Sequence, residues 1–558
     1  MHYRFIGKFV CSLVLSLLAP IAMAASSLSI RPMDYTYHDK MIALGSTLTI
    51  PYQITNNTTQ TLYNVKAALL PSGISSSVCT TLAPKSSCTL NLKIDWRLTR
   101  NPREIDQSFT ICAKGNPNIC TWVNPKNRLN ITVGNFNTFL AITDIHLKAG
   151  NTSPITYGQD TNDALWESTL TKISKLIPEQ LPQFMVLLGD LPAHRDRPNL
   201  EKNIAGVLQG ISKLDAINKN KLPVFFVFGN NDSLKVNYGP FSNDSKNLFS
   251  LDPQHNSPET KGWPALNANP DCSVSPNKAC TYTTTNPMPS AHAEDMAYAA
   301  TRGYYSAYPL GTAYPLRFIS VNSVIFSHEY FQSGETQLSA AQEQMNWLEQ
   351  QLKNASANNE AVYIAMHIPI GKDAFNHGED MWNDTLVLNN GLKFRDAFLA
   401  LMSQYKQNVR TVMTGHTHYN EYRALYADKT LTNVSVLGLG LPGITPNHYN
   451  NPGMQVYLYD GAYRLTEAKT HFTTPDLREW KSYSFQNDYD CQKNSTMLNC
   501  VANTLLPKLS EWQLGLKRDL QNPYQINFSV RSPNYDPSTG GVSSWSAILD
   551  AIQVIPTQ

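Results

Sequence analysis

Two different patterns of apolar and polar positions divide the chain. In the first, short runs of partly alternating residues, rich in β-branched side chains, are separated by Gly, Pro, Asn and Ser; they span 46–57, 62–71, 88–94, 108–114 and 128–133. Alternation with a period of two is typical of strands that bury one face. We therefore predict that residues 25–134 form an all-β sandwich. This region holds no cluster of His or carboxylate residues, so we assign it no chemistry.

The second pattern begins at Asn135, where apolar runs of strand length alternate with helix-like stretches. The strand-like runs span 138–143, 184–189, 224–229, 317–322, 362–367 and 409–414. Residues 163–177 and 340–355, which lie between such runs, have the apolar spacing of helices. This alternation is typical of a layered α/β fold whose strands are buried on both faces. We predict such a domain over residues 135–475 and a partly helical C-terminal extension over residues 476–558.

The first residues of the chain indicate the compartment in which the protein is expected. Arg4 and Lys8 precede an apolar run, and Ala22-Met23-Ala24 supplies small residues at a cleavage site, so residues 1–24 are predicted to be a secretory signal peptide. An uncleaved anchor helix is the alternative, but the apolar run is short for a membrane span. No later segment approaches spanning length. We expect an exported protein, secreted or periplasmic.

The formal net charge is +2, and no basic run stands out. This balance gives no reason to expect nucleic acid or an anionic membrane as an obligate partner.

The cysteines support export. Of nine cysteines, Cys11 leaves with the signal peptide, and the other eight fall in close couples: Cys79/Cys88, Cys112/Cys120, Cys272/Cys280 and Cys491/Cys500. An even number in an exported chain indicates disulfide bonds, and the two-residue spacings of a cysteine zinc site are absent. We predict local pairing of Cys79 with Cys88 and of Cys112 with Cys120, although four cysteines allow three pairings.

The residues that are candidates for metal binding follow the predicted strands of the α/β region. Each of five short motifs, "AITDIH", "LLGD", "FGNND", "AMHIP" and "TGHTH", lies where an apolar run ends; together they supply Asp144, His146, Asp190, Asn230, His367, His416 and His418. Strand ends of α/β proteins converge at one edge of a sheet. Asp, His and Asn are oxygen and nitrogen donors suited to Zn, Mn or Fe. Seven donors exceed the needs of one metal ion but suit two ions that share a bridging carboxylate.

The order of these motifs resembles the calcineurin-like metallophosphoesterases over about residues 137–470. The segments "GDLPAHRD", "HIPIG", "GHTHYNEY" and "PGMQVYLYDG" are similar to the acid sphingomyelinase-like branch of that superfamily. The resemblance implies a four-layer α/β/β/α sandwich with a two-metal site. The β-sandwich ahead of it resembles the immunoglobulin-like modules that precede catalytic domains in many exported bacterial proteins.

The resemblance also implies which residues bind which ion. Asp144, His146, Asp190 and His418 would hold the first ion, and Asp190, Asn230, His367 and His416 the second. Zinc is the expected metal, with manganese and iron as alternatives. Two such ions lower the pKa of a bridging water, which attacks phosphorus in line with the leaving oxygen.

Two further residues are expected to take part in catalysis. His194 follows Asp190 by four positions and is predicted to be the general acid; the alternative is an ordinary solvated loop residue. Asn231 stands where many members of this branch have His, and its amide can donate a hydrogen bond but no proton. Asn231 therefore stabilises the transition state with His194 as sole acid, or marks a site for good leaving groups, or marks an inactive site.

The sequence thus predicts an exported binuclear-metal phosphodiesterase of acid sphingomyelinase-like type, with a small-molecule or lipid phosphoester as substrate. The alternative activity is cleavage of phosphoanhydrides or phosphomonoesters in nucleotides or polyphosphate, because the turn G-N-N-D also resembles polyphosphate-cleaving relatives. The alternative from another class is an exported binding protein with a vestigial metal site.

Overall fold

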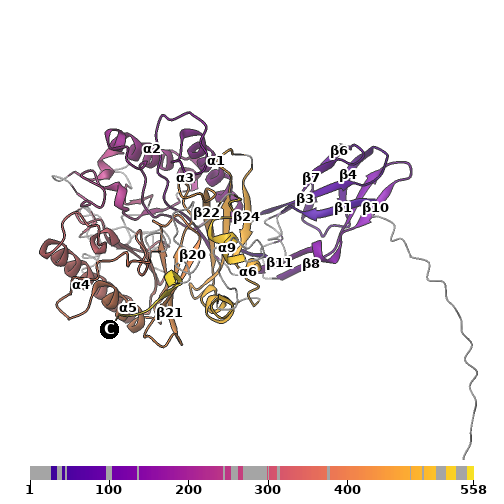
Figure 1. Ribbon diagram of the computed structural model, residues 1–558. Helices are drawn as coiled ribbons and strands as arrows, with labels where there is room; N and C mark the ends of the chain where they lie inside the picture. The colour runs from indigo at the N-terminus through magenta and orange to yellow at the C-terminus, as the bar shows by residue number, and fades with distance from the viewer. Residues whose placement is uncertain are drawn as a thin grey trace, which may run out of the picture.

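The computed structural model describes residues 27–33, 40–43, 47–95, 98, 103–134, 137–220, 222–242, 246–252, 262–267, 298–299, 301–310, 314–373, 378–477, 479–492, 495–509, 523–533, 535 and 550–557. The described residues between 28 and 134 form a β module that lies beside a larger body of two sheets and several helices (Figure 1). The predicted signal peptide and the couple Cys272/Cys280 lie outside the described residues.

The N-terminal module consists of three small sheets. Their orders are β1-β3-β7-β5, β10-β9-β4-β6 and β2-β11-β8. The strands are β1 (Leu28–Pro32), β2 (Lys40–Ala43), β3 (Leu48–Asn56), β4 (Leu62–Ala68), β5 (Ile74–Ser76), β6 (Val78–Leu82), β7 (Ser87–Ile94), β8 (Arg103–Gln107), β9 (Thr110–Lys114), β10 (Ile119–Trp122) and β11 (Leu129–Gly134). Alternate residues of β1 and β7 enter one apolar core, as the period of two predicts. The immunoglobulin-like relationship stays a prediction.

Three disulfide bonds join the predicted couples, Cys79–Cys88, Cys112–Cys120 and Cys491–Cys500. The local pairing predicted for the N-terminal module is therefore confirmed. Cys112 and Cys120 are direct partners in the register of β9 and β10, so this bond joins adjacent strands.

The first sheet of the larger body has seven strands in the order β15-β14-β13-β12-β22-β23-β24. They are β12 (Asn137–Ile142), β13 (Met185–Leu187), β14 (Val224–Phe226), β15 (Ala265–Leu266), β22 (Gly453–Tyr459), β23 (Leu465–Phe472) and β24 (Lys481–Ser484). β12, β13 and β14 are parallel neighbours. Helices α1 (Asp163–Gln180), α2 (Leu200–Ser212) and α3 (Asp215–Asn220) belong to this half of the body (Figure 1).

The second sheet also has seven strands, in the order β16-β17-β18-β19-β21-β20-β25. They are β16 (Tyr305–Ala307), β17 (Leu316–Val321), β18 (Ala361–Met366), β19 (Val409–Thr414), β20 (Glu421–Tyr426), β21 (Val434–Gly440) and β25 (Gln553–Val554). β17, β18 and β19 run parallel. Helices α4 (Glu335–Ala357) and α5 (Phe394–Gln404) belong to this half.

Successive residues of the central strands enter different cores, which gives the body its layers. In β12, Phe139 and Ala141 join the core that also contains Phe318 of β17, whereas Leu140 and Ile142 pack in a core with residues of the helices. Both faces of β12 are therefore buried, as its continuous apolar run predicts. The order of layers is helices, sheet, sheet and helices. The mixed α/β fold expected from the sequence is confirmed.

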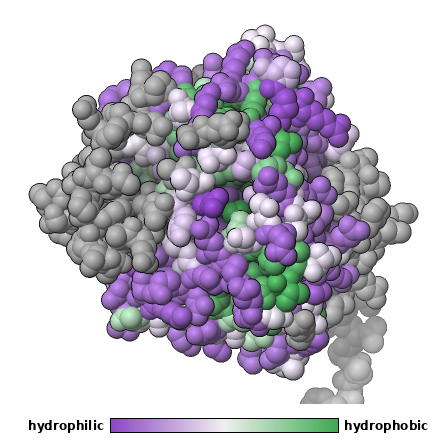
Figure 2. Space-filling view, turned by 90° about the vertical axis from the view of Figure 1, so that its left-hand side faces the viewer, coloured by the Kyte–Doolittle hydropathy of each residue, from purple (hydrophilic) through white to green (hydrophobic). Residues whose placement is uncertain are grey.

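The C-terminal residues return to the body. They include α6 (Phe485–Asp488), α7 (Met497–Cys500), a short π-helix (Val501–Leu505), α8 (Leu506–Leu509) and α9 (Pro523–Phe528). After these, β25 joins the edge of the second sheet beside β20. No helix in the described part of the chain combines the length and apolar character needed to cross a membrane. On the face turned away from the N-terminal module, hydrophobic residues form small areas among hydrophilic ones (Figure 2).

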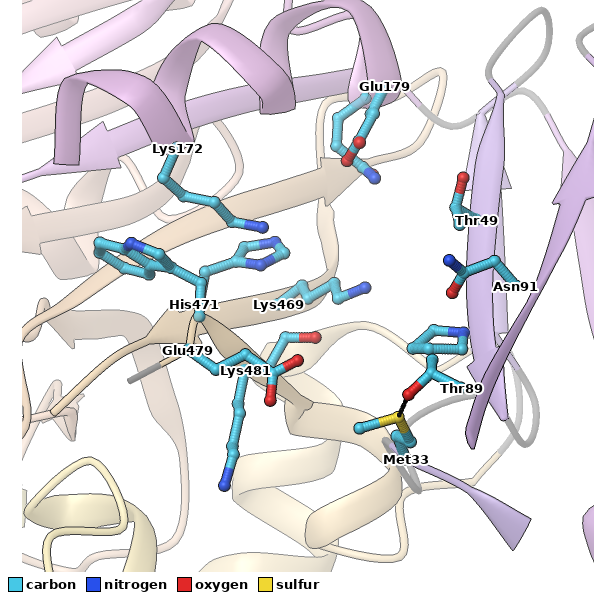
Figure 3. A pocket seen from close by; sticks show the side chains of 14 residues that line it. Met33, Thr49, Thr89, Asn91, Lys172, Glu179, Lys469, His471, Glu479 and Lys481 are labelled. Carbon is cyan, nitrogen blue, oxygen red and sulfur yellow. Dashed lines mark hydrogen bonds between the residues drawn. The ribbon is translucent and has the colours of Figure 1, made fainter. Parts of the chain in front are cut away.

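The N-terminal module and the first sheet enclose a cavity of about 350 Å³. Thr49 and Asn91 face it from the module, and Lys172 and Lys469 face it from the body (Figure 3). On β23 the face that carries Lys469 also carries His471, whereas the partner strand β22 carries apolar residues there. At this end of the sheet the cavity is therefore lined mostly by polar and charged side chains, which come from the module, from α1 and from β23 and β24.

Candidate metal centre

All seven predicted metal ligands follow directly on strands of the two sheets. β12 leads to Asp144 and His146, β13 to Asp190, β14 to Asn230, β18 to His367, and β19 to His416 and His418. The first sheet thus supplies the carboxylates, the amide and one imidazole, and the second supplies three imidazoles. Because the strands concerned are parallel within each sheet, their carboxyl ends meet at one edge.

The backbone is unusual at these residues. Asp144, His146, Asp190, His416 and His418 have φ angles of 47°, 47°, 55°, 73° and 64°. Non-glycine residues rarely adopt this left-handed region, which costs about 1–3 kcal/mol each and is concentrated at functional sites. Five of the seven predicted ligands therefore sit on strained backbone.

The glycines that precede the ligands act in two different ways. Gly189 has a φ of 84°, a conformation that glycine adopts without a steric penalty and that lets the chain turn sharply. Gly229 and Gly415 do not have positive φ; instead, an added Cβ would collide with Asp190 at Gly229 and with Asp144 at Gly415. Their role is close packing of the strand ends, not backbone freedom.

The carboxylates and imidazoles converge on a small buried volume. Oδ2 of Asp190 lies 3.5 Å from Nε2 of His146 and 3.3 Å from Nε2 of His367. Oδ1 of Asp144 lies 3.4 Å from Nε2 of His418. Asp190 therefore lies between imidazoles from both sheets, the place expected for a bridging ligand.

Two histidines are fixed by backbone carbonyls so that Nε2 faces this volume. Nδ1 of His146 lies 3.0 Å from the carbonyl oxygen of Pro192, and Nδ1 of His367 lies 2.6 Å from that of Leu188. A carbonyl only accepts, so Nδ1 carries a proton, which leaves Nε2 as the nitrogen that can offer a lone pair to a metal ion. Metal-binding histidines commonly have this arrangement.

The donors fit divalent metal ions. Asp144, His146 and Asp190 form one group whose ligand atoms lie within 4.8 Å of one another, and Asp190, His367 and His416 form another. Nε2 of His146 is buried and has no hydrogen-bond partner among the described residues. A buried imidazole nitrogen without a partner is costly unless a ligand occupies its lone pair. Nitrogen and carboxylate donors suit zinc, manganese or iron.

Asn230 completes the second group. Its Oδ1 lies 3.1 Å from Nε2 of His367, and its Nδ2 donates to Oδ1 of Asn237 at 3.0 Å. The Asn237 contact leaves the carbonyl oxygen of Asn230 turned toward the imidazole, as a metal ligand requires.

Asn231 contacts Asp190. Its side-chain Nδ2 donates to Oδ2 of Asp190 at 2.7 Å, and its backbone N–H donates to Oδ1 at 2.8 Å. From the sequence, Asn231 is expected to stabilise the transition state with a hydrogen bond. In this structure its amide instead binds the carboxylate that is predicted to bridge the metals. Asp232 supports the same turn by accepting hydrogen bonds from the N–H groups of Gly229 and Asp190.

The crowding of charges shifts the pKa values of these groups in opposite directions. Burial favours the neutral acid, but the nearby His367, followed by His146 and His416, holds the pKa of Asp190 well below its usual range. Burial disfavours the charged imidazole, yet the carboxylates of Asp190 and Asp144 raise the pKa of His367 to about 9. Burial and the neighbouring His367 lower the pKa of His416 to about 4. Such divergent pKa values are typical of functional sites.

His194, the predicted acid, lies beside this centre. Its ring stacks on that of His146, with centroids 3.7 Å apart and planes inclined by 17°. Its Nδ1 lies 2.7 Å from Oδ1 of Asp160. His146, His194 and His418 also bring one nitrogen each within 4.8 Å, so the geometry permits His194 to be either an acid or a further ligand.

A cavity of about 270 Å³ opens over the centre. His194 and Asn231 line it with four of the predicted ligands, while Asp144, His146 and His367 lie beneath. Its other walls are Asn237, Tyr238, Asp373, Thr417 and His448, none of which is predicted from the sequence. Thr417 could have been found between the two histidines of "GHTH"; the other four carry no motif.

The family model of the calcineurin-like phosphoesterases matches residues 138–420, which is half of the chain. The chain belongs to this family. The match contains all seven predicted ligands and both predicted catalytic residues.

Curated relatives of this calcineurin-like phosphoesterase include sphingomyelinases. The sphingomyelinase phosphodiesterase C of Dictyostelium discoideum is 26% identical over 327 residues, which cover 56% of this chain and 62% of the relative. The human sphingomyelin phosphodiesterase is 24% identical over 281 residues, which cover 49% of this chain and 36% of the relative. A human cyclic GMP-AMP phosphodiesterase is 27% identical over 163 residues, which cover 27% and 34%. The chain spans less than two thirds of the length of each.

Proposed function

We propose that this chain is an exported, binuclear-metal phosphodiesterase of acid sphingomyelinase-like type. The observation that carries the proposal is the meeting of seven oxygen and nitrogen donors from two sheets around Asp190. Asp144, His146, Asp190 and His418 would hold one ion, and Asp190, Asn230, His367 and His416 the other. Zinc is the proposed metal.

Metal ions bound there supply Lewis-acid stabilisation of phosphoryl oxygens and a water that ionises near neutral pH. The chain's own groups do the remaining work. Asn231 holds both oxygens of Asp190 and so fixes this carboxylate between its imidazole neighbours. His194 lies at the wall of the cavity, where it delivers a proton to the leaving oxygen.

We propose a small-molecule or lipid phosphodiester as the substrate. The relatives named above are phosphodiesterases that act on sphingomyelin or cyclic GMP-AMP, which supports this class. The disulfide bonds and the signal-like N-terminus support export to the periplasm or the medium.

A substrate panel with metal analysis tests the proposal. The metal-reconstituted protein, without residues 1–24, is incubated with sphingomyelin, a cyclic dinucleotide, a nucleoside triphosphate, polyphosphate, and matched 4-nitrophenyl mono- and diesters. We expect about two metal ions per chain and turnover of diesters. An Asp190→Asn variant should lose both, while Asp215→Asn, on the exposed surface of α3, should lose neither. Less than one ion per chain would contradict the binuclear site, and a fully loaded protein without turnover would indicate a binding protein.

The second candidate is hydrolysis of phosphoanhydrides. It is favoured by Asn231, because an amide that holds Asp190 offers no second proton donor, and a phosphate leaving group needs none. Faster turnover of the triphosphate or polyphosphate than of every diester would establish this activity instead.

A further inference from the structure

Asp160 holds His194 through both carboxylate oxygens. Nδ1 of His194 lies 2.7 Å from Oδ1 of Asp160, and the backbone N–H of His194 donates to Oδ2 at 2.8 Å. Nδ2 of Asn447 donates a further hydrogen bond to Oδ1 at 3.1 Å. An ionised carboxylate only accepts hydrogen bonds, so Nδ1 of His194 carries the proton in this contact.

The loop that carries Asp160 is fixed from two sides. The N–H of Lys148 donates to the carbonyl of Thr161 at 2.9 Å, beside the strand end that bears the first ligands. The N–H of Gly158 donates to the carbonyl of Pro446 at 3.0 Å, in the loop that also bears Asn447. Asp160 is therefore held in place by the fold, independently of any molecule in the cavity.

His194 is held from a second direction by its stacking on His146. The face of the ring is fixed by this contact, and the Nδ1 edge is fixed by Asp160. The remaining nitrogen, Nε2, is then the one available to exchange a proton with a molecule in the cavity that His194 lines.

We propose that Asp160 is the positioning residue for His194. By accepting from Nδ1–H, it selects the tautomer and the ring orientation in which Nε2 serves the reaction. His194 acts as an acid in its doubly protonated form, in which Nε2 also carries a proton. As the bond from phosphorus to the leaving oxygen breaks, that proton passes to the oxygen, His194 is left as the neutral Nδ1–H tautomer, and Asp160 stays ionised throughout. The inference rests on the proposed function, because it needs a leaving group that requires protonation.

The competing role for this pair is metal binding, because a carboxylate on the far nitrogen is also common behind a metal-bound imidazole. In that case, loss of Asp160 would weaken metal binding. Positioning of an acid instead leaves the metal in place and changes how the rate depends on the leaving group.

The test is a series of aryl methyl phosphates whose phenols differ in acidity, assayed with Asp160→Asn and Asp160→Glu. Removal of acid catalysis costs about 10²–10⁴-fold, so Asp160→Asn should cost about 10–100-fold in kcat/KM on the least acidic phenol and little on 4-nitrophenol. Asp160→Glu should recover part of the loss. Asp163 lies in the same segment, but its carboxylate accepts from the N–H of Gly150 and has no contact with His194 in the described part of the chain. Asp163→Asn is the matched control and should match the unmodified protein.

A double-mutant cycle separates positioning from general destabilisation. In the His194→Ala background, Asp160→Asn should cost less than about twofold, because the group it orients is absent. An equal loss on every phenol, an undiminished loss in the His194→Ala background, or a fall in bound metal would each overturn the inference. Selective loss with unchanged metal content supports it.

A measurement that needs no turnover tests the contact between Asp160 and His194 independently of the proposed function. Histidine-selective ¹⁵N NMR, recorded at a pH at which the ring is neutral and with His194 assigned from the His194→Gln variant, should show the Nδ1–H tautomer in the unmodified protein and its loss in Asp160→Asn. A chain that shows this tautomer but cleaves no phosphodiester contradicts the proposed function while leaving the Asp160 contact intact. An Nε2–H tautomer in the unmodified protein overturns the inference.

Discussion

Asn231 differs from the histidine expected at its position in both chemistry and orientation. Its amide points to Oδ2 of Asp190, so that the backbone N–H and one N–H of the side-chain amide bind the same carboxylate. The substitution removes one possible proton donor and adds a support for the predicted bridging ligand. At the residue scale, the proposed proton transfer is thus left to His194.

Asn231→Ala should weaken metal binding more than it changes leaving-group preference. It removes the hydrogen bond to Oδ2 of Asp190, and the loss of such an outer contact typically costs about 10–100-fold in metal affinity. Competition with a chelator measures the affinity, and Asn218→Ala, in α3 and outside the lining of the cavity, is the control. Unchanged metal affinity together with slower cleavage of only the poor leaving groups would show that Asn231 acts on the substrate.

At the scale of elements, the C-terminal residues support the loops that hold the ligands. The ring of Phe528 in α9 stacks on Tyr419, the residue after His418, with centroids 4.3 Å apart. The carbonyl of Phe528 accepts from the N–H of Asn420 at 3.0 Å. Asn451, in the loop before β22, donates through Nδ2 to the carbonyl of Val530 at 2.9 Å. The segment around α9 is thus part of the wall behind the site.

Phe528→Ala should therefore lower both stability and metal retention. Phe528 is fully buried, and truncation of such a ring costs about 3–5 kcal/mol in the free energy of unfolding. Chemical denaturation measures this loss, and metal content after dialysis measures the loosening of the loop. Tyr314→Ala, which removes a largely exposed ring, should change neither. A stable Phe528→Ala variant with full metal content would mean that α9 does not support the loop.

At the scale of the whole molecule, buried ionisable groups away from the metal centre make stability depend on pH. Glu467 lies on the outward face of β23 and accepts hydrogen bonds from the N–H groups of Ala468 and Gln486. Burial nevertheless dominates and raises the pKa of its carboxyl group from 4.5 to about 7.

Glu467 should make the protein less stable as the pH rises. Its folded pKa lies above its unfolded value, so the folded protein holds the proton more tightly. The resulting stability is complete below about pH 4.5 and is lost as the pH rises through about 7, in total roughly 3 kcal/mol. The melting temperature of Glu467→Gln should fall less than that of the unmodified protein between pH 5 and 8. Equal slopes for the two proteins would contradict the shift, and the exposed Glu479→Gln serves as control.

The residues of the candidate metal centre can be predicted from the sequence more completely than the contacts around them. Each predicted ligand follows an apolar run, and parallel strands must bring such residues together, so the set could be predicted without coordinates. Asp160 could not, because it lies in an irregular loop and reaches His194 only through the packing of residues 155–161 against 443–447. The orientation of Asn231 depends in the same way on where Asp190 is placed. β25 is too short to carry a pattern and joins its sheet only by tertiary contact.

The register of β12 has a consequence for how the chain acquires its fold. β12 is the first strand of the larger body, yet its antiparallel neighbour is β22, with Asn137 opposite Tyr459. Until β22 emerges, β12 is an open edge whose unpaired backbone groups can bind other chains. Contacts so distant in sequence slow folding, because a long loop must close before they form. The first sheet therefore stays incomplete until β22, late in the larger body, has been synthesised.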